Sequence, residues 1–298
     1  MPASETILPF RVGARTLWSV RRALVRRRVP LEAALAGPRP DLPPLGAKED
    51  GYLIAGLPAH LAAPLAGETG LRPFVRQRYP RSYARLDQDF ETYFAGFSAK
   101  SRSTCRRKLK RMAERSGGTI DLRCYRTPEE MAAFHAEARA LSALTYQERL
   151  LGAGIPEGAE AEAEMRTLAA ADQARGWLLR LDRRPIAYLY APAEGDALLY
   201  AYLGYDPAHA DLSPGTVLQL EAMRQLMAER RFALFDFTEG DGQHKRLFAT
   251  DSIDCVDLLL LRPSPSNLAA GHLLTGFDRT IALAKRALGE KAARLARR

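Results

Sequence analysis

From residue 97 onward, apolar and polar positions alternate along the chain with the periods of helices and strands. Residues 98–116 have the spacing of a helix, with Ser98 or Ser101 as its N-cap and Gly117-Gly118 as its end. Residues 119–125 alternate with period two, which predicts a strand with one solvated face. Thr127-Pro128-Glu129-Glu130 is a capping box with proline at the first helical position, so a second helix is expected to run to about Leu144.

The remaining pattern predicts a helix ending at Gly176, a hairpin, a central strand, a crossover helix and two more strands. These lie at residues 159–174, 177–190, 197–205, 213–230, 233–237 and 252–261. A meander followed by a helical crossover into another strand gives a mixed sheet. The predicted fold class is therefore α/β (α+β) with a mixed sheet.

Four regions are expected along the chain. Residues 1–50 form a basic arm, with a basic helix near residues 17–28, and a proline-rich linker. Residues 51–95 form a small α/β subdomain, too small for an independent core. The main domain covers residues 96–262, and residues 263–298 form a basic amphipathic helix.

The composition is that of an ordinary globular protein, with 298 residues, 47% of them hydrophobic and 27% charged. No apolar run approaches the roughly 20 residues that cross a bilayer, and the N-terminus lacks a signal-peptide core. Cys105, Cys124 and Cys255 fit neither a disulfide framework nor a metal-ligand spacing, so no metal is expected. We expect a cytoplasmic protein, with peripheral contact at the inner face of the membrane as a further hypothesis.

The net charge of +9 is concentrated in residues 100–115 and at the C-terminus. Such clusters attract phosphate-bearing cofactors, nucleic acid or anionic lipid, or simply form a solvated helix face. The basic segment lacks interleaved aromatic residues, and no nucleic-acid-binding motif is present. Specific nucleic-acid binding is therefore not expected.

The segment 235–248 combines an apolar strand with a turn that carries acid, base and cation. Asp236 ends the strand, Glu239 and Asp241 lie in a glycine-rich turn, and His244 and Lys245 follow. Strand ends of this kind are where α/β proteins build their sites. The alternative is a surface hairpin whose charges face water.

A second candidate lies at Ser213-Pro214-Gly215-Thr216, which opens the crossover helix. Serine can cap the helix, proline suits its first turn, and glycine allows a ligand to approach the unpaired amides. The helix dipole adds positive charge, which suits a pyrophosphate. The alternative is a well-made helix start without a ligand.

The order of elements resembles the GNAT acyltransferase fold, and several motifs resemble the BioF2-like (CelD-type) acetyltransferase domain, a relative of the Fem peptidyltransferases. The residues that carry the resemblance are 98–108, 213–215, 236–241 and Lys245, within residues 85–262. The resemblance implies a GNAT-like fold with a smaller, incomplete N-terminal GNAT-like half. The pyrophosphate loop has one glycine and no arginine, and His244 stands where the family often has tyrosine. The donor therefore stays open, since Fem relatives use aminoacyl-tRNA and other GNAT enzymes use acyl-CoA.

The reaction that the resemblance implies is direct attack of an amine on the thioester of acetyl-CoA or a longer acyl-CoA. Asp236, Glu239 or Asp241 would act as the base, directly or through water, with His244 as a rival. Lys245 would stabilise the oxyanion or the thiolate. Two further roles are expected. Tyr202 would protonate the thiolate, unless it is a packed strand residue, and the donor-binding set is Leu203, Ser213, Pro214, Gly215 and Thr216.

The acceptor is expected near Tyr146, Gln147, Glu148 and Arg149, between the first two core helices. A small-molecule or lipid amine, or a precursor of the envelope or its polysaccharides, would fit the resemblance. The basic C-terminal segment would suit an enzyme at an anionic membrane surface. Three classes of function remain: an acyl-CoA-dependent N-acyltransferase, a Fem-like aminoacyl transferase that uses charged tRNA, and a non-catalytic binding module.

Overall fold

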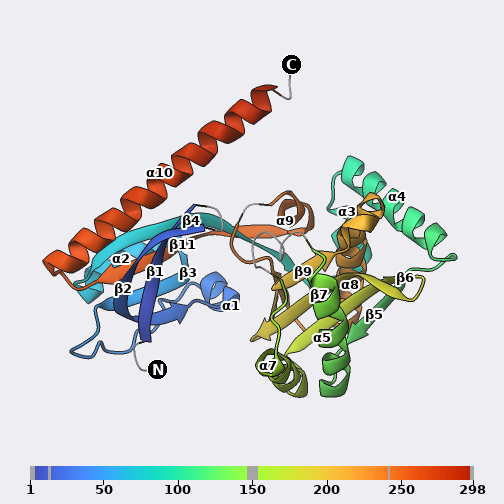
Figure 1. Ribbon diagram of the computed structural model, residues 1–298, viewed down its shortest axis with the longest axis horizontal. Coiled ribbons are helices and arrows are strands. Elements are labelled where there is room, and N and C mark those ends of the chain that lie inside the picture. The colour runs from blue at the N-terminus through green and yellow to red at the C-terminus, as the bar shows by residue number, and fades with distance from the viewer. Residues whose placement is uncertain (1–3, 13–14, 146–153, 241, 296–298) are drawn as a thin grey trace. The chain divides into compact units, whose positions relative to one another are not determined.

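The computed structural model describes residues 4–12, 15–145, 154–240 and 242–295 (Figure 1). They form two compact units, Met1–Pro80 with Ile253–Arg298, and Arg81–Ser252. The division falls inside two strands, β4 (Arg72–Arg85) and β11 (Asp251–Leu261). It differs from the expected boundaries because β11 pairs with β3 (Gly51–Pro58), which joins the C-terminal residues to the first 80.

The first unit has a sheet in which β1 and β2 are antiparallel, β2 and β3 parallel, and β3 and β11 antiparallel. The expected basic helix near residues 17–28 is wrong, because β1 is Ser4–Val12 and β2 is Arg15–Arg28. Leu24 and Val25 of β2 are buried on opposite faces of the sheet, and pairing on both sides satisfies the backbone. The arginines on this strand do not prevent it, since long side chains keep their charged ends in water.

Helices cover both faces of this first sheet. The short helices α1 (Leu31–Ala36) and α2 (Ala62–Thr69) pack on one face, and α10 (Pro265–Leu295) packs on the other (Figure 1). A Cβ on Gly271 of α10 would lie 2.4 Å from the ring of Phe74, so glycine is what lets the helix approach the sheet. No helix in the described part of the chain is long and apolar enough to cross a membrane.

The second unit contains the mixed sheet that the sequence predicts. Its strand order runs from the end of β4 through β10, β8, β7 and β6 to β5, and β9 pairs with β7. The pairing of β10 with β8 is parallel, and the other pairings are antiparallel. The strands are β5 (Asp121–Tyr125), β6 (Ala174–Leu181), β7 (Arg184–Glu194), β8 (Ala197–Leu199), β9 (Tyr202–Tyr205) and β10 (Leu234–Asp236). The predicted fold class, α/β with a mixed sheet, is confirmed.

The helices of the second unit pack on two faces of this sheet. One buried cluster joins the sheet to α3, α4 and α8, and another joins it to α5 and α7. The helical segments are α3 (Phe90–Ala95), α4 (Ala99–Arg115), α5 (Pro128–Ser142), α7 (Ala159–Ala170), the 3-10 helix η2 (Pro207–Leu212), α8 (Pro214–Glu229) and α9 (Gln243–Phe248). The Ser98 cap and the Thr127–Glu130 capping box are both confirmed.

Two details of the second unit differ from the sequence prediction. The helix expected over residues 159–174, with Gly176 as its stop signal, ends at Ala170. Gly176 lies in β6, where a Cβ would sit 2.9 Å from the Phe134 ring. The central strand expected over residues 197–205 is interrupted between β8 and β9. This interruption matters, because β8 pairs with both β7 and β10, whereas β9 pairs with β7 beyond the end of β10.

Candidate functional site

The interrupted strand creates a divergence in the middle of the second sheet. Leu199 and Asp236 form the last register pair between β8 and β10, and the N–H of Tyr200 donates to the Asp236 carbonyl oxygen at 2.9 Å. Beyond this point the chain continues in β9 on the β7 side, and β10 ends. The two strands therefore stop pairing with each other here. The candidate residues after β10 begin at this point.

The carboxylate of Asp236 is fully buried and is held by a buried arginine. Arg81 donates from Nε at 3.0 Å and from Nη2 at 2.5 Å to Asp236 Oδ2. The other oxygen, Oδ1, accepts the N–H of Thr238 at 2.7 Å, and Thr238 has a φ of +60°. Asp236 therefore fixes the start of the turn. Arg81 is a site residue that the sequence does not single out, because its only signal is an arginine within an aromatic strand segment.

Lys245 projects from α9 back into the turn. Its side chain is 9% exposed, and Nζ donates a hydrogen bond to the carbonyl oxygen of Glu239. Gly240, with a φ of +99°, has no Cβ, and a Cβ there would lie 3.7 Å from Nζ. Burial lowers the pKa of the Lys245 ammonium, and the charges of Glu239 and Asp236 partly oppose this. As the sequence predicts, the Lys245 cation therefore lies against the turn that contains Glu239.

His244 lies beside Tyr200, which sequence analysis did not single out. The two ring centroids are 5.5 Å apart, and Tyr200 also packs against Phe235 and Phe237. Part of the His244 side chain is exposed, but burial of the rest, and then the charge of Lys245, lower its pKa. A neutral imidazole and a cationic amine thus stand next to each other in α9. Burial raises the pKa of Tyr200, which stays protonated.

Tyr202 points into a different environment from Tyr200. Its ring stacks on Tyr190 with centroids 6.5 Å apart, next to the cluster that α5 and α7 cover. This is the packed strand residue that the sequence analysis named as the alternative. The break in the strand explains how Tyr200 and Tyr202, two positions apart, come to lie in different clusters.

The start of α8 lies next to β9 and α4. Ser213 has a left-handed backbone (φ +53°) and makes no capping hydrogen bond with its side chain, so the expected serine cap is wrong. A Cβ on Gly215 would lie 3.3 Å from Leu203 Cδ2, so the missing side chain brings α8 close to β9. Lys108 Nζ donates to Thr216 Oγ1 at 3.1 Å. The first turn of α8 therefore combines the positive end of the helix dipole with a lysine.

Two clefts border this region of the second unit. One, of 510 Å³, lies between α4 and η2 and is lined by Arg111, Arg115 and His209 among others. Arg111 pairs there with Asp211 at 2.7 Å. The other, of 360 Å³, lies between α3, the start of α4 and α9, where Arg246 and Phe97 line it. The first cleft lies between α4 and the residues of η2 that precede α8.

Comparison with known proteins identifies the domain. Residues 99–246 match the family model described as Acetyltransferase (GNAT) domain. They carry a GNAT domain. Searching the curated proteins gave no match.

Two solved structures share the fold of most of the chain. FemX has a TM-score of 0.54 at 11% identity, covering 75% of this chain and 75% of that one. The C-terminal domain (DUF2156) of an Agrobacterium fabrum protein described as a lysylphosphatidylglycerol synthetase has a TM-score of 0.53 at 14% identity, covering 79% of this chain and 73% of that one. The predicted GNAT fold is confirmed, and the finer BioF2-like resemblance stays a prediction.

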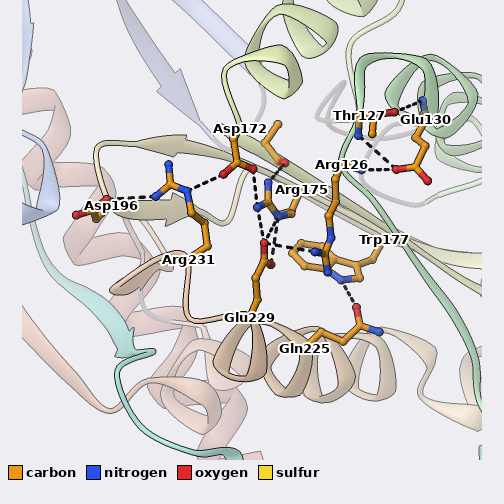
Figure 2. A network of polar contacts seen from close by, with 11 residues as sticks. Arg126, Thr127, Glu130, Asp172, Arg175, Trp177, Asp196, Gln225, Glu229 and Arg231 are labelled. Carbon is orange, nitrogen blue, oxygen red and sulfur yellow. Dashed lines mark hydrogen bonds and ion pairs between the residues drawn. The ribbon is translucent and has the colours of Figure 1, made fainter.

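The far end of α8 in the GNAT domain is anchored by a network of charged residues (Figure 2). Arg175, which is 1% exposed, contacts Glu229 at 2.5 Å and Asp172 at 2.7 Å, and Arg231 contacts Asp172 at 2.7 Å. Trp177 Nε1 donates to Gln225 Oε1 at 2.9 Å. These contacts join α8 to β6 and to the turn after α7, so the helix is held at the end opposite to Thr216.

Several expected residues cannot be placed in the GNAT domain. Asp241 and the predicted acceptor residues Tyr146, Gln147, Glu148 and Arg149 lie outside the described residues. Among the described residues no group of three or more His, Cys, Asp or Glu is arranged to hold a metal ion. Cys105 is buried, and burial raises the pKa of its thiol, which argues against a reactive thiolate.

Proposed function

We propose that this protein is an N-acyltransferase that moves an acyl group from acyl-CoA to an amine by direct attack. The observation that carries the proposal is the divergence of β9 from β10 at Asp236, with the start of α8 on one side and Lys245 on the other. In the proposal, the helix start binds an anion, the extended arm enters where the strands separate, and Lys245 is the cation at the reacting centre. The GNAT family match supports a transferase.

The donor would lie with its pyrophosphate at the first turn of α8. There the helix dipole favours negative charge, and Lys108 adds a full positive charge beside Thr216. Leu203 would contact the pantetheine arm as it enters between β9 and β10. Acetyl-CoA and longer acyl-CoA thioesters share this arm, so the proposal covers both.

The chemistry would take place between His244, Lys245 and Tyr200. The amine nitrogen forms a bond to the thioester carbon while a base accepts its proton. His244 is suited to this because its lowered pKa keeps it neutral near pH 7. Glu239 and Asp241 are the alternative bases. Asp236, held by Arg81, would position the turn.

Lys245 would stabilise the oxyanion that develops on the carbonyl. The carbon–sulfur bond then breaks, and the CoA thiolate takes a proton from Tyr200 or from Lys245. Tyr202, the residue expected from the sequence for this step, packs against Tyr190 instead. The products are an amide and free CoA.

The acceptor is proposed to be a small-molecule or lipid amine, or an amine of an envelope or polysaccharide precursor. Residues 146–149 would orient it. A membrane-bound acceptor would agree with the basic residues near the C-terminus. Co-sedimentation of the full chain with anionic vesicles tests this part, and a protein that stays in the supernatant contradicts it.

The proposal as a whole is tested by calorimetric titration and thermal shift with acetyl-CoA, a long-chain acyl-CoA and free CoA. A ligand that binds the native state raises Tm by mass action. Selective stabilisation by one acyl-CoA identifies the donor. No response to any of them contradicts the proposal.

A second candidate is aminoacyl transfer from charged tRNA. The observation that favours it is the exposed basic side of α4, which carries Lys100, Arg106, Arg107, Lys110 and Arg111. The fold likeness to FemX is compatible with it. Binding of charged tRNA with a steep salt dependence, together with no CoA binding, would favour this candidate.

A further inference from the structure

Gln219, in the second turn of α8, has a buried side-chain amide that makes no hydrogen bond with the described residues. The residue is 2% exposed, and neither Oε1 nor Nε2 has a hydrogen-bond partner among the described residues. Buried side-chain amides are normally paired, and leaving one unpaired destabilises the fold. Gln225 on the same helix shows the ordinary case, because its Oε1 accepts the Trp177 N–H at 2.9 Å. The exception at Gln219 needs a physical reason.

The position of Gln219 on α8 connects it to the opening between the strands. Gly215 and Gln219 are four residues apart, so they lie on the same side of the helix. The Gly215 side faces β9, since a Cβ there would lie 3.3 Å from Leu203 and 3.6 Å from Tyr205. Gln219 is therefore on the side of α8 that faces the sheet.

The direction of the helix places Gln219 near the strand break. α8 connects β9 to β10, and β10 is parallel to β8, so the helix runs back against the strands. A step from Gly215 to Gln219, about 6 Å along the axis, leads from the end of β9 towards its start. The start of β9 lies just after Leu199, where the pairing of β8 with β10 ends.

We propose that Gln219 hydrogen-bonds a secondary amide of the pantetheine arm of the acyl donor. This inference rests on the proposed function and deepens it. A glutamine amide offers one acceptor and two donors, which complement the N–H and C=O of a secondary amide. Because the glutamine amide is enclosed, the arm has to part the side chains between β9 and β10 to reach it. The acyl group of an aminoacyl-tRNA is held by a ribose ester, which has no such amide, so Gln219 selects for a CoA donor.

The inference predicts opposite effects on stability and on donor binding when Gln219 becomes apolar. Gln219→Met and Gln219→Leu remove the unpaired amide, so Tm rises by roughly 2–4 °C without ligand. The Kd for CoA becomes about tenfold weaker in both variants. Adenosine 3′,5′-bisphosphate, which lacks the pantetheine arm, binds as it does to the wild type.

Gln225→Met is the matched control on the same helix. It breaks the hydrogen bond to Trp177, so it lowers Tm and leaves the CoA affinity unchanged. Thermal shift and calorimetry on the full-length variants measure both quantities.

Three results overturn the inference, and they are distinguishable. If CoA binds the Gln219 variants as tightly as the wild type, the glutamine does not contact the donor, although the proposed function stands. If both apolar variants have a lower Tm, Gln219 is paired within the fold. If the wild type does not bind CoA at all, the proposed donor fails, and this inference fails with it.

Discussion

Arg81 and Asp236 form a buried ion pair at the point where the two central strands separate, with Arg81 Nη2 2.5 Å from Asp236 Oδ2. Their side chains are 3% and 0% exposed. The same carboxylate accepts the N–H of Thr238, so it joins β4 to the turn that leads to Lys245. The pair therefore controls the geometry of the candidate site without itself needing to meet a substrate.

Breaking this pair should be costly for the fold. Arg81→Met leaves the Asp236 charge buried without its partner, and we expect a loss of about 3–5 kcal/mol in the free energy of unfolding. The double variant Arg81→Met, Asp236→Leu removes both charges and should recover most of that loss. Urea unfolding of the single and double variants measures the effect.

The matched control for this prediction is Arg111→Met. Arg111 pairs with Asp211 at the surface, where both side chains are more than half exposed. Such pairs contribute roughly 0–1 kcal/mol. If Arg81→Met and Arg111→Met lose the same free energy of unfolding, the buried pair contributes no more to stability than the exposed one.

The sequence was enough to predict much of the second unit, because its signals are local. The Ser98 cap, the Thr127 capping box and the period-two pattern of β5 each depend on a few neighbouring residues. Arg81 was not predictable in this way. Its partner lies 155 positions later in the chain, and nothing in a single sequence shows which buried charges will meet.

Two errors also have long-range causes. The arginines of β2 favoured a solvated helix by composition, but the strand is defined by its pairing with β1 and β3. The break between Leu199 and Tyr202 depends on distant partners, because β8 pairs with both β7 and β10, whereas β9 continues along β7 after β10 has ended. Apolar residues on both sides of the break make the segment look continuous, so the sequence does not show that Tyr200 lies beside His244 and that Tyr202 stacks on Tyr190.

Lys245 should destabilise the fold while serving the reaction. Its pKa is lowered by burial, so between that pKa and the usual value near 10.5 the unfolded chain binds more protons than the folded one. Stability therefore rises with pH through this window, and at neutral pH the buried charge is unfavourable. Lys245→Met is expected to raise Tm at pH 7 and to abolish acyl transfer.

The gain in Tm from Lys245→Met should shrink as the pH approaches 10.5, where the wild-type lysine loses its charge in both states. Thermal unfolding from pH 7 to pH 10 checks this. Lys110→Met removes an exposed lysine, with 79% of its side chain in solvent, and should change neither Tm nor activity. A Lys245→Met protein that keeps its activity would rule out the proposed role.

His244 should determine the acid side of the pH–rate profile. Burial and Lys245 lower its pKa below 6.5, so the base form is lost only under more acidic conditions than for a free imidazole. kcat/KM with the acyl-CoA identified by titration should therefore fall below that pKa and be level above it. His244→Gln should lower kcat by about 10²–10⁴-fold and remove this titration.

The control for His244 is His60→Gln, at an exposed position in the short 3-10 helix Ala59–Leu61. It should leave the profile unchanged. If a carboxylate rather than His244 is the base, the acid limb does not depend on the imidazole. If the acid side of the pH–rate profile is unchanged in His244→Gln, the base is Glu239 or Asp241 and not His244.

Lys108 is expected to bind the donor through charge. It lies on α4 with Nζ 3.1 Å from Thr216 Oγ1, at the start of α8. Lys108→Met removes one charge-assisted contact to the pyrophosphate, so the Kd for CoA should become about 10–100-fold weaker. The salt dependence of binding should become shallower, because one fewer cation meets the phosphates.

Lys110→Met, two residues away on the exposed side of the same helix, keeps the Kd of the wild type if position matters more than net charge. If Lys110→Met and Lys108→Met weaken binding equally, the phosphates are attracted by the general charge of α4, and the start of α8 is not their site.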